Sequence, residues 1–540
     1  MTDTLKIRRK GTSLQSVTKY IDLLVILSVI GELFFFPSWH NFSGCVMTVI
    51  VWLIFRNFFF KKRIILEHPF SFLAFLSIFL ASFIPLTATL MESKPITYGF
   101  QNPYETFFYQ TLIFIVASLA FYAVVYKKRT KNNIIQRTLY KLNFFETEPS
   151  TLWILGLIGL LARIKSLAVV NEVQYGDAGN KFLEGLTYLQ YAPIIMFFPT
   201  LSGLPYNKFR NNLVLIYTSF TFVVSFAANS RQQMIYPIFT ILLLFVLYLL
   251  KDNISIFSLL SPWKIGTIVF IVFFGLGFLS DISLAMLANR KIRNDVSRNE
   301  LLDNTIETMQ NEKLMEKLRN TSIEVQDNVF NYSRGWDETY LNNFMINRYG
   351  NARVIDQTLY YANKIGYGNK KMQESFYEKT LAIYPLPFLS LMGITIDKEE
   401  LEYSPGDKLY FTGTHTPSAL GGFRVTSLVG DGLATFGYWC FPIVFVLLFL
   451  SFTLMDSLVL FRNGGILFST LGLINIFGFL GMFRNSISSI VPLAYILRGF
   501  WQECSIFWIL VFFIKLIQIP NKNRRKIYRR PYISGQNFLQ

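Results

Sequence analysis

The sequence predicts an all-α polytopic membrane protein with about 12 transmembrane helices and a large, mainly helical outward loop between spans 9 and 10. Hydrophobic residues make up 52% of the 540 positions, phenylalanine alone accounts for 55, and only 16% are charged. Several apolar runs are roughly 20 residues long, the length at which an α-helix crosses a bilayer. Composition and segment length together exclude an ordinary soluble domain.

The apolar runs define the expected spans in order. They lie near residues 21–38, 43–60, 70–90, 105–126, 150–168, 186–203, 212–229, 234–250, 265–287, 433–456, 464–482 and 499–519. Spans 1–9 therefore occupy residues 1–287, an extracytoplasmic loop domain covers 288–430, spans 10–12 occupy 431–519, and a basic cytoplasmic tail covers 520–540. Because the first run is long enough to span, we expect a retained first helix rather than a cleaved signal.

Basic clusters set the expected orientation, since Lys and Arg are concentrated on the cytoplasmic side. Such clusters occur in the N-terminal LKIRRK, in FKKR before residue 64, in KKRTKNNIIQRTLYK and in the tail NKNRRKIYRR. Both termini are then cytoplasmic and residues 288–430 face outward. The net charge of +17 is explained by orientation and by contact with membrane lipids, so we expect no nucleic-acid partner. Three scattered cysteines form no disulfide framework and no metal motif.

Several arginines lie at expected outward helix ends. Arg231 follows a break of small residues in SFAANSRQQMIYPI, and others occur late in span 5 or beside spans 9, 11 and 12: Arg163, Arg290, Arg484 and Arg498. Taken singly, each is explained as a snorkelling side chain at a helix end. Taken together, they predict an anion site at the outer leaflet, because guanidinium binds phosphate bidentately and stays charged.

The outward loop contains further candidates. Ser297 and Glu300 fit a capping box that opens an amphipathic helix. The stretch that follows mixes aromatic, acidic, basic and amide residues, a composition that suits sugar rings or simply a small helical domain. Its candidate glycan contacts are Trp336, Arg348, Tyr349 and Arg353.

Two residues near span 10 are candidates for acid–base chemistry. His415 could act as a general base on a bound hydroxyl, or merely hydrogen-bond the backbone of its loop. Asp431 could orient a sugar or a base, or cap span 10. We found no Asp-x-Asp cluster and no Cys/His spacing for zinc, so no essential metal and no cofactor are expected.

In two motifs the chain resembles the Wzy-type oligosaccharide repeat-unit polymerases, which are GT-C-like membrane glycosyltransferases. The motifs are FAANSRQQMIYPI at an outward helix junction and TPSALGGFRVTSLVGDGLATFGYWCFPIVF leading into span 10. A large outward loop late in the chain accompanies them. In the second motif, Asp431 and the pair Phe436-Gly437 occupy the places of the family's acidic and aromatic-Gly elements.

The resemblance implies an activity and a location. It implies transfer of a growing glycan from polyprenyl (undecaprenyl) pyrophosphate onto a lipid-linked oligosaccharide repeat unit, at the outer face of the bacterial inner membrane and without metal or nucleotide. The product would be O-antigen, capsule or exopolysaccharide, with a chain-length regulator protein and a flippase as possible partners. Arg231 and then Arg424 would contact pyrophosphate, with His415 as general base and Asp431 in reserve.

Three alternatives remain open at this stage. An O-antigen ligase would use the same lipid-pyrophosphate donor with a lipid A core as acceptor. A polysaccharide flippase could also have twelve helices, but needs charges along a central cavity rather than a large outward loop. A sensor or scaffold would not need arginines at so many outward helix ends.

Overall fold

The secondary-structure elements of the described residues are helices, apart from one small hairpin. The computed structural model describes residues 14–126, 132–146, 148–168, 182–227, 231–256, 261–289, 298–320, 329–416, 419–462, 465–484 and 487–518. Within these residues the only strands, β1 (Val459–Arg462) and β2 (Gly465–Phe468), pair antiparallel, with Val459 opposite Phe468. The predicted all-α class is confirmed.

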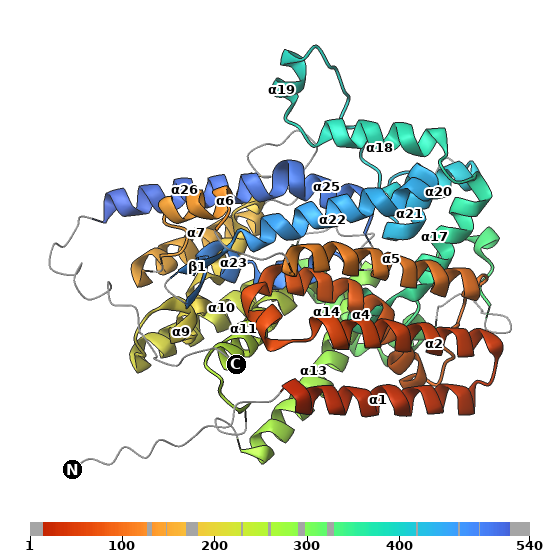
Figure 1. Ribbon diagram of the computed structural model, residues 1–540, viewed down its shortest axis with the longest axis horizontal. Helices are drawn as coiled ribbons and strands as arrows, with labels where there is room; N and C mark the ends of the chain where they lie inside the picture. Colours follow the sequence, from red (N-terminus) through yellow and green to blue (C-terminus); the bar gives the residue numbers. More distant parts are fainter. Residues whose placement is uncertain are drawn as a thin grey trace.

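Long helices run alongside one another in the main bundle (Figure 1). In its first half these are α1 (Leu14–Phe35), α2 (Trp39–Ile54) with its π-helical continuation η1 (Phe55–Phe59), α3 (Lys62–Glu67), α4 (Pro69–Met91), α5 (Pro103–Val125), α6 (Ile134–Lys141), α7 (Pro149–Ala168), η2 (Thr187–Phe197), α9 (Pro199–Ser202), α10 (Lys208–Ala227), α11 (Arg231–Lys251) and α13 (Pro262–Ala288). In its last part they are α22 (Cys440–Asp456), α23 (Thr470–Ile474), α24 (Ile476–Met482), α25 (Ile490–Ala494), η7 (Tyr495–Gly499) and α26 (Phe500–Ile517).

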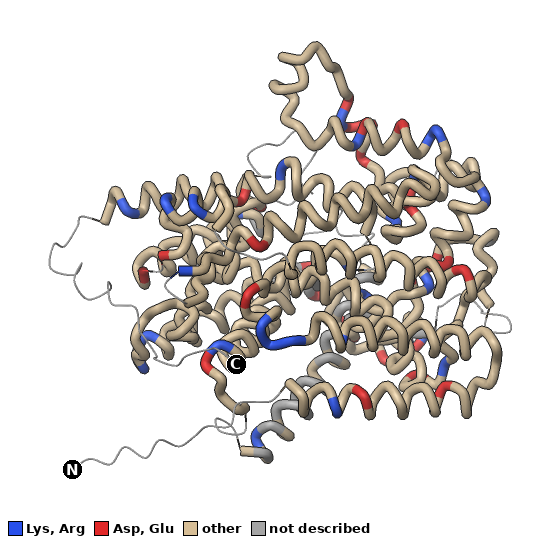
Figure 2. Tube along the Cα trace, in the orientation of Figure 1, with Lys and Arg blue, Asp and Glu red and all other residues tan. Residues whose placement is uncertain are grey.

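Six helices in the described part of the chain are long and apolar enough to cross a membrane. They are Trp39–Phe59, Pro69–Met91, Pro103–Val125, Gln233–Lys251, Leu428–Asp456 and Ile490–Ile517. Figure 2 shows long uncharged stretches along α4, α5 and α22, with charged positions toward their ends. The chain is therefore a multi-pass membrane protein; the count of twelve spans and the sidedness stay predictions.

Two expected spans are not single α-helices. Residues 186–203 form the 3-10 helix η2 and the short α9, and η2 contains Pro193, which has no N–H to donate within a helix. Residues 464–482 form β2 and then α23 and α24, which are separated at Asn475. The Asn475 side chain donates instead to the Glu503 carboxylate, 3.0 Å away. Apolar length alone predicted continuous α-helices here, and that prediction is wrong. Broken helices at membrane depth occur where backbone is buried in protein or lines a cavity.

Phenylalanine fills the interior between the long helices. Phe55 stacks on Phe79 with ring centroids 3.9 Å apart, and Phe75 stacks on both Phe114 and Phe121. These rings come from η1, α4 and α5 and are almost completely buried. Stacked aromatic contacts add to the burial energy of such side chains, which accounts for part of the high phenylalanine content.

The described part of the long polar segment, residues 288–430, packs against the bundle. Its described helices, with the start of the next span, are α14 (Arg298–Gln310), α15 (Glu312–Asn320), η4 (Tyr332–Arg334), α16 (Phe344–Gly350), α17 (Ala352–Ile365), α18 (Lys370–Ala382), α19 (Leu386–Leu391), α20 (Pro405–Thr414), α21 (Leu428–Phe436) and η6 (Gly437–Trp439). α16 contacts α4, and α17 contacts both α5 and α21; α17 lies at one end of the bundle, at the right of Figure 1. The expected capping residue Ser297 lies outside the described residues.

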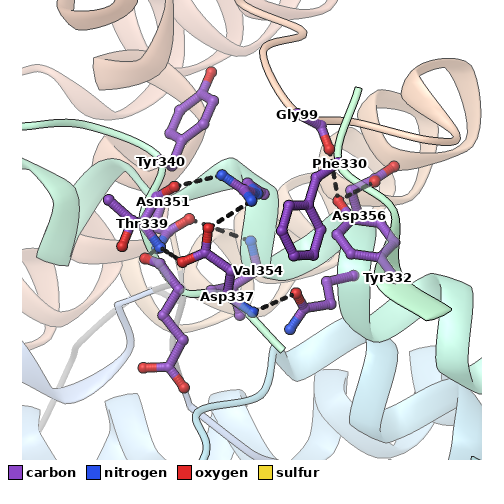
Figure 3. Close-up of polar contacts among 12 residues, drawn as sticks. Gly99, Phe330, Tyr332, Asp337, Thr339, Tyr340, Asn351, Val354 and Asp356 are labelled. Carbon is purple, nitrogen blue, oxygen red and sulfur yellow. Dashed lines mark hydrogen bonds and ion pairs between the residues drawn. The ribbon is translucent and has the colours of Figure 1, made fainter. Parts of the chain in front are cut away.

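The Asp356 carboxylate joins α17 to the start of α5. Its oxygens accept hydrogen bonds from the backbone N–H groups of Gln101 and Asn102, at 2.7 and 2.9 Å, and from the Thr106 hydroxyl at 2.8 Å. The Tyr332 hydroxyl donates to it as well (Figure 3). Burial raises the pKa of Asp356, and these hydrogen bonds oppose that shift.

Arg353, one turn earlier on α17, is completely buried beside this carboxylate. Its guanidinium pairs with Asp337 at 2.6 Å, donates to the Thr339 carbonyl at 2.6 Å and lies 4.4 Å from the ring centre of Phe330. Gly99 passes close by in a left-handed conformation, where an added Cβ would lie 3.0 Å from the Arg353 Nε. Arg353 and Asp356 of α17 thus serve to hold the polar segment in place.

Replacing Asp356 with alanine should strongly destabilise the protein. The variant leaves three donors without their acceptor, the Gln101 and Asn102 N–H groups and the Thr106 hydroxyl, while the Tyr332 hydroxyl keeps the Gly99 carbonyl. Each buried unsatisfied donor costs about 1–3 kcal/mol. We expect the free energy of unfolding to fall by about 3 kcal/mol or more, measured by thermal unfolding of the detergent-purified protein. Glu374→Ala, at an exposed position of α18, is the matched control and should leave the melting temperature nearly unchanged. Equal melting temperatures for the two variants would contradict this role.

Candidate functional site

A cavity of about 540 Å³ lies where the polar segment meets the bundle. Five parts of the chain form its wall: the first turns of α11, the end of α16, the loop before α20, the loop before α21, and α24 with the residues that follow it. The lining residues are Ile235, Tyr236, Arg348, Tyr349, Ser404, Pro405, Phe423, Arg424, Val425, Thr426, Phe477, Gly478, Gly481, Met482, Arg484, Ile487, Ser488 and Val491. Phe423 is 49% exposed, so the cavity reaches the surface at that side.

Three arginines line this cavity, Arg348, Arg424 and Arg484, and the charge of Arg424 is paired with the buried Asp407 carboxylate. The Nε of Arg484 is buried and has no hydrogen-bond partner among the described residues. Burial, and then the neighbouring Arg348 guanidinium, lower the pKa of Arg484 to about 10. Burial also lowers the pKa of Arg348. At neutral pH the Arg484 guanidinium stays protonated, since a pKa of about 10 lies well above 7.

Asp407 holds the third arginine, Arg424, in the cavity wall. Its carboxylate pairs with the Arg424 guanidinium at 2.9 Å and accepts the backbone N–H groups of Ser404, Phe423 and Arg424, at 3.1, 2.8 and 3.1 Å. The Ser404 hydroxyl in turn donates to the Arg424 carbonyl at 2.6 Å. The Asp407 side chain is completely buried, so one carboxylate fixes three residues that line the cavity.

Asp407 is not among the residues predicted from the sequence, although the sequence contains a signal for it. Ser404 and Asp407 form a capping box at the start of α20, with the spacing S-x-x-D and Pro405 at the first helical position. This pattern predicts a helix start. It does not predict that the capping carboxylate also binds a loop 17 residues further along the chain.

The rest of the wall includes aromatic side chains and glycines. Tyr236, Tyr349, Phe423 and Phe477 supply rings, while Gly478 and Gly481 on α24 leave room in front of them. Burial raises the pKa of Tyr349, and the Arg484 and Arg348 charges oppose that rise. The described lining contains no carboxylate and no imidazole. The cavity can therefore hold an anion that carries an attached ring or apolar group.

Of the predicted site residues, the structure brings Arg348, Tyr349, Arg424 and Arg484 together in this cavity. Arg231 begins α11, one turn before the lining residues Ile235 and Tyr236. Only its backbone is described, so its contact with an anion stays a prediction. Arg290 lies outside the described residues.

Three other predicted arginines lie elsewhere. Arg163 is buried within α7. Arg498 donates to the Gln502 side chain at 2.7 Å and to the Ile383 carbonyl at 3.3 Å. Arg353, a predicted glycan contact, is the fully buried partner of Asp337. In this position it is out of reach of a glycan, because its side chain is completely buried.

Trp336 also has a packing role. Its ring stacks on Tyr361 with centroids 5.5 Å apart, and its indole N–H donates to Glu338 at 3.1 Å. Glu338 accepts the Val425 backbone N–H as well, at 2.9 Å, and burial raises its pKa. The pair thus supports the back of the cavity wall at Val425.

Neither predicted acid–base residue lines the cavity. His415 is exposed and ends α20 in a left-handed conformation, with φ of 57°. Asp431 is buried in α21, where it accepts the Ser489 backbone N–H at 2.9 Å and the Ser489 hydroxyl at 2.6 Å. Because Ser488 is a lining residue, Asp431 positions the wall from behind. The cap of α21 is Ser427, not Asp431.

Fold and cavity define a multi-pass α-helical membrane protein with an arginine-rich cavity at one end of its bundle. Comparison with models of protein families, with curated proteins and with solved structures found no match for this chain. The function is therefore argued from the residues of the cavity.

Gly406→Ala should displace Arg424 without changing any charge. An added Cβ would lie 2.4 Å from the Arg424 carbonyl oxygen. We expect the affinity for inorganic pyrophosphate, measured by calorimetry on the purified protein, to fall about tenfold or more, because a hydrogen bond to a charged group contributes about 1.5–3 kcal/mol. Gly335→Ala is the control, since nothing lies within 4 Å of its added Cβ. Equal affinity in both variants would argue against the placement of Arg424.

Gly481→Leu should block the cavity while preserving the fold. The added Cβ would lie 4.0 Å from the Tyr349 hydroxyl, an ordinary contact, and the rest of the side chain would occupy empty space. We expect an unchanged melting temperature together with loss of pyrophosphate binding. Gly277→Leu on α13, where nothing lies within 4 Å, should leave binding intact. Normal binding by the Gly481 variant would place the anion outside this cavity.

Proposed function

We propose that this protein is a polysaccharide repeat-unit polymerase of the bacterial cytoplasmic membrane. It would transfer a growing glycan from polyprenyl (undecaprenyl) pyrophosphate onto a lipid-linked oligosaccharide repeat unit at the outer face of that membrane. The observation that carries the proposal is the convergence of Arg348, Arg424 and Arg484, from three separate segments, in one cavity at the end of the bundle.

The transfer reaction requires stabilisation of the negative charge that develops on its leaving group. The acceptor hydroxyl oxygen forms a bond to the anomeric carbon while the bond from that carbon to pyrophosphate breaks. Negative charge therefore develops on the leaving pyrophosphate, and the acceptor proton must be removed. Preorganised guanidinium groups that are shielded from water stabilise this charge more strongly than exposed ones would.

The size and wall of the cavity also support this donor. Its volume of about 540 Å³ lies within the range of small-molecule sites and suits a pyrophosphate with an attached sugar. Tyr236, Tyr349 and Phe477 offer ring faces on which sugar C–H groups can pack. His415 and Asp431 stay predictions for proton transfer, and the proposal assigns the leaving-group contacts to the arginines alone.

A gene deletion complemented with variants tests the proposal. The deletion strain should lose its ladder of long surface glycans, with one repeat unit still attached to the final carrier. Arg484→Ala should fail to restore the ladder and Arg484→Lys should restore it in part, because lysine lacks the bidentate fork. Arg63→Ala is the matched control, since Arg63 is 83% exposed and pairs with Glu67 on its own helix. Immunoblots of membranes should show equal amounts of every variant.

Other outcomes of the same experiment would refute the polymerase. Full-length polymer left on polyprenyl pyrophosphate would indicate a ligase. Lipid-linked single repeat units held on the cytoplasmic side would indicate a flippase. A full glycan ladder in the strain complemented with Arg484→Ala would show that the cavity takes no part in the reaction.

A further inference from the structure

The short helix α19 presents apolar side chains away from the rest of the molecule. Figure 1 shows it at the top, extending beyond α18 and separate from the bundle. Four apolar residues within Leu386–Met392 are strongly exposed: Leu386 50%, Phe388 47%, Leu391 87% and Met392 60%. Exposed apolar residues gathered in so short a segment indicate a surface that is covered in the native setting.

Two lysines hold the base of this projection. The Lys398 ammonium donates to the carbonyls of Ala382 and Tyr384, at 2.9 and 2.6 Å. The Lys379 ammonium donates to the carbonyls of Leu401 and Tyr403, at 3.0 and 2.6 Å. Burial lowers the pKa of Lys379 to about 8, so it is still mainly protonated at neutral pH. These hydrogen bonds thus connect the segments that lead to and from α19, and they fix the orientation of α19.

The base of the projection contacts a candidate membrane span. Arg498 belongs to the span Ile490–Ile517 and donates to the carbonyl of Ile383, three residues before α19 begins. The same span exposes Trp501, 47% accessible, and further along Phe512 and Phe513. Trp501 lies at the start of α26. Tryptophan near a helix end is typical of the membrane–water interface. α19 therefore starts beside the region where this span leaves the bilayer.

We propose that α19 inserts its apolar face into the lipid leaflet next to the start of the span Ile490–Ile517. That span also exposes apolar side chains, among them Trp501, three residues after Arg498, and a bilayer is the one partner that a multi-pass protein always has. The residues after α19 are acidic, with Asp397, Glu399, Glu400 and Glu402 close together. Insertion is thus driven by apolar contact and not by attraction to anionic headgroups. This inference is independent of the proposed enzymatic function.

Depth-dependent fluorescence quenching tests the insertion. The full chain carrying Leu391→Cys is labelled with a small environment-sensitive maleimide and reconstituted in phosphatidylcholine nanodiscs, one protein per disc. The native cysteines are buried, and unsubstituted protein serves as the labelling blank. We expect strong quenching by lipids with a nitroxide on the acyl chain and little quenching by aqueous iodide. Adding anionic lipid or salt should change neither result.

The matched control is Glu374→Cys, an exposed position on the polar helix α18. We expect the reverse pattern there, with quenching by iodide and not by acyl-chain nitroxide. If the probe at position 391 is quenched by iodide as much as the control, α19 lies in water and the inference is wrong. If its protection from iodide appears only when two copies share a disc, α19 binds a second copy, and the lipid assignment is likewise wrong.

Discussion

The arrangement of this protein depends on one buried carboxylate, Asp356, which accepts hydrogen bonds from four donors. Two of the donors are the backbone N–H groups just before α5, so the carboxylate ties α17 to the end of a membrane helix. α17 follows directly on α16, which carries Arg348 and Tyr349. The position of these two lining residues thus depends on a contact outside the cavity. A buried carboxylate with every oxygen satisfied gives that contact a single geometry.

The arginines of the cavity differ in whether their guanidinium groups have partners. Arg424 has a buried carboxylate directly behind it, whereas the Nε of Arg484 is buried without a hydrogen-bond partner among the described residues. Removing a guanidinium from water is costly unless an anion is paired with it. A bound pyrophosphate would supply that anion. Its binding would therefore offset the free-energy cost of burying the Arg484 guanidinium. The difference between Arg424 and Arg484 is the physical reason to regard the cavity as a binding site rather than as a packing defect.

The cavity also depends on broken helices. α24 is short because the chain turns at Asn475, and its two glycines face the cavity together with Phe477. A continuous helix from 464 to 482 would have directed a full apolar surface to the bundle. The break leaves space beside α11 and α16, and Asn475 compensates by donating to Glu503. Interrupted membrane segments next to charged side chains recur where membrane proteins bind ions or anionic groups.

The sequence by itself determined the class of the protein, because runs of roughly 20 apolar residues have few stable arrangements other than membrane helices. It also singled out Arg348, Tyr349, Arg424 and Arg484, all of which line the cavity. Only the tertiary structure decided that Arg353 lies inside the polar segment, that His415 lies outside the cavity and that Asp407 lies behind Arg424. Residue type and local spacing specify what a side chain can bind. Which partner it meets depends on contacts between segments that are far apart in the chain, and local patterns carry no information about those.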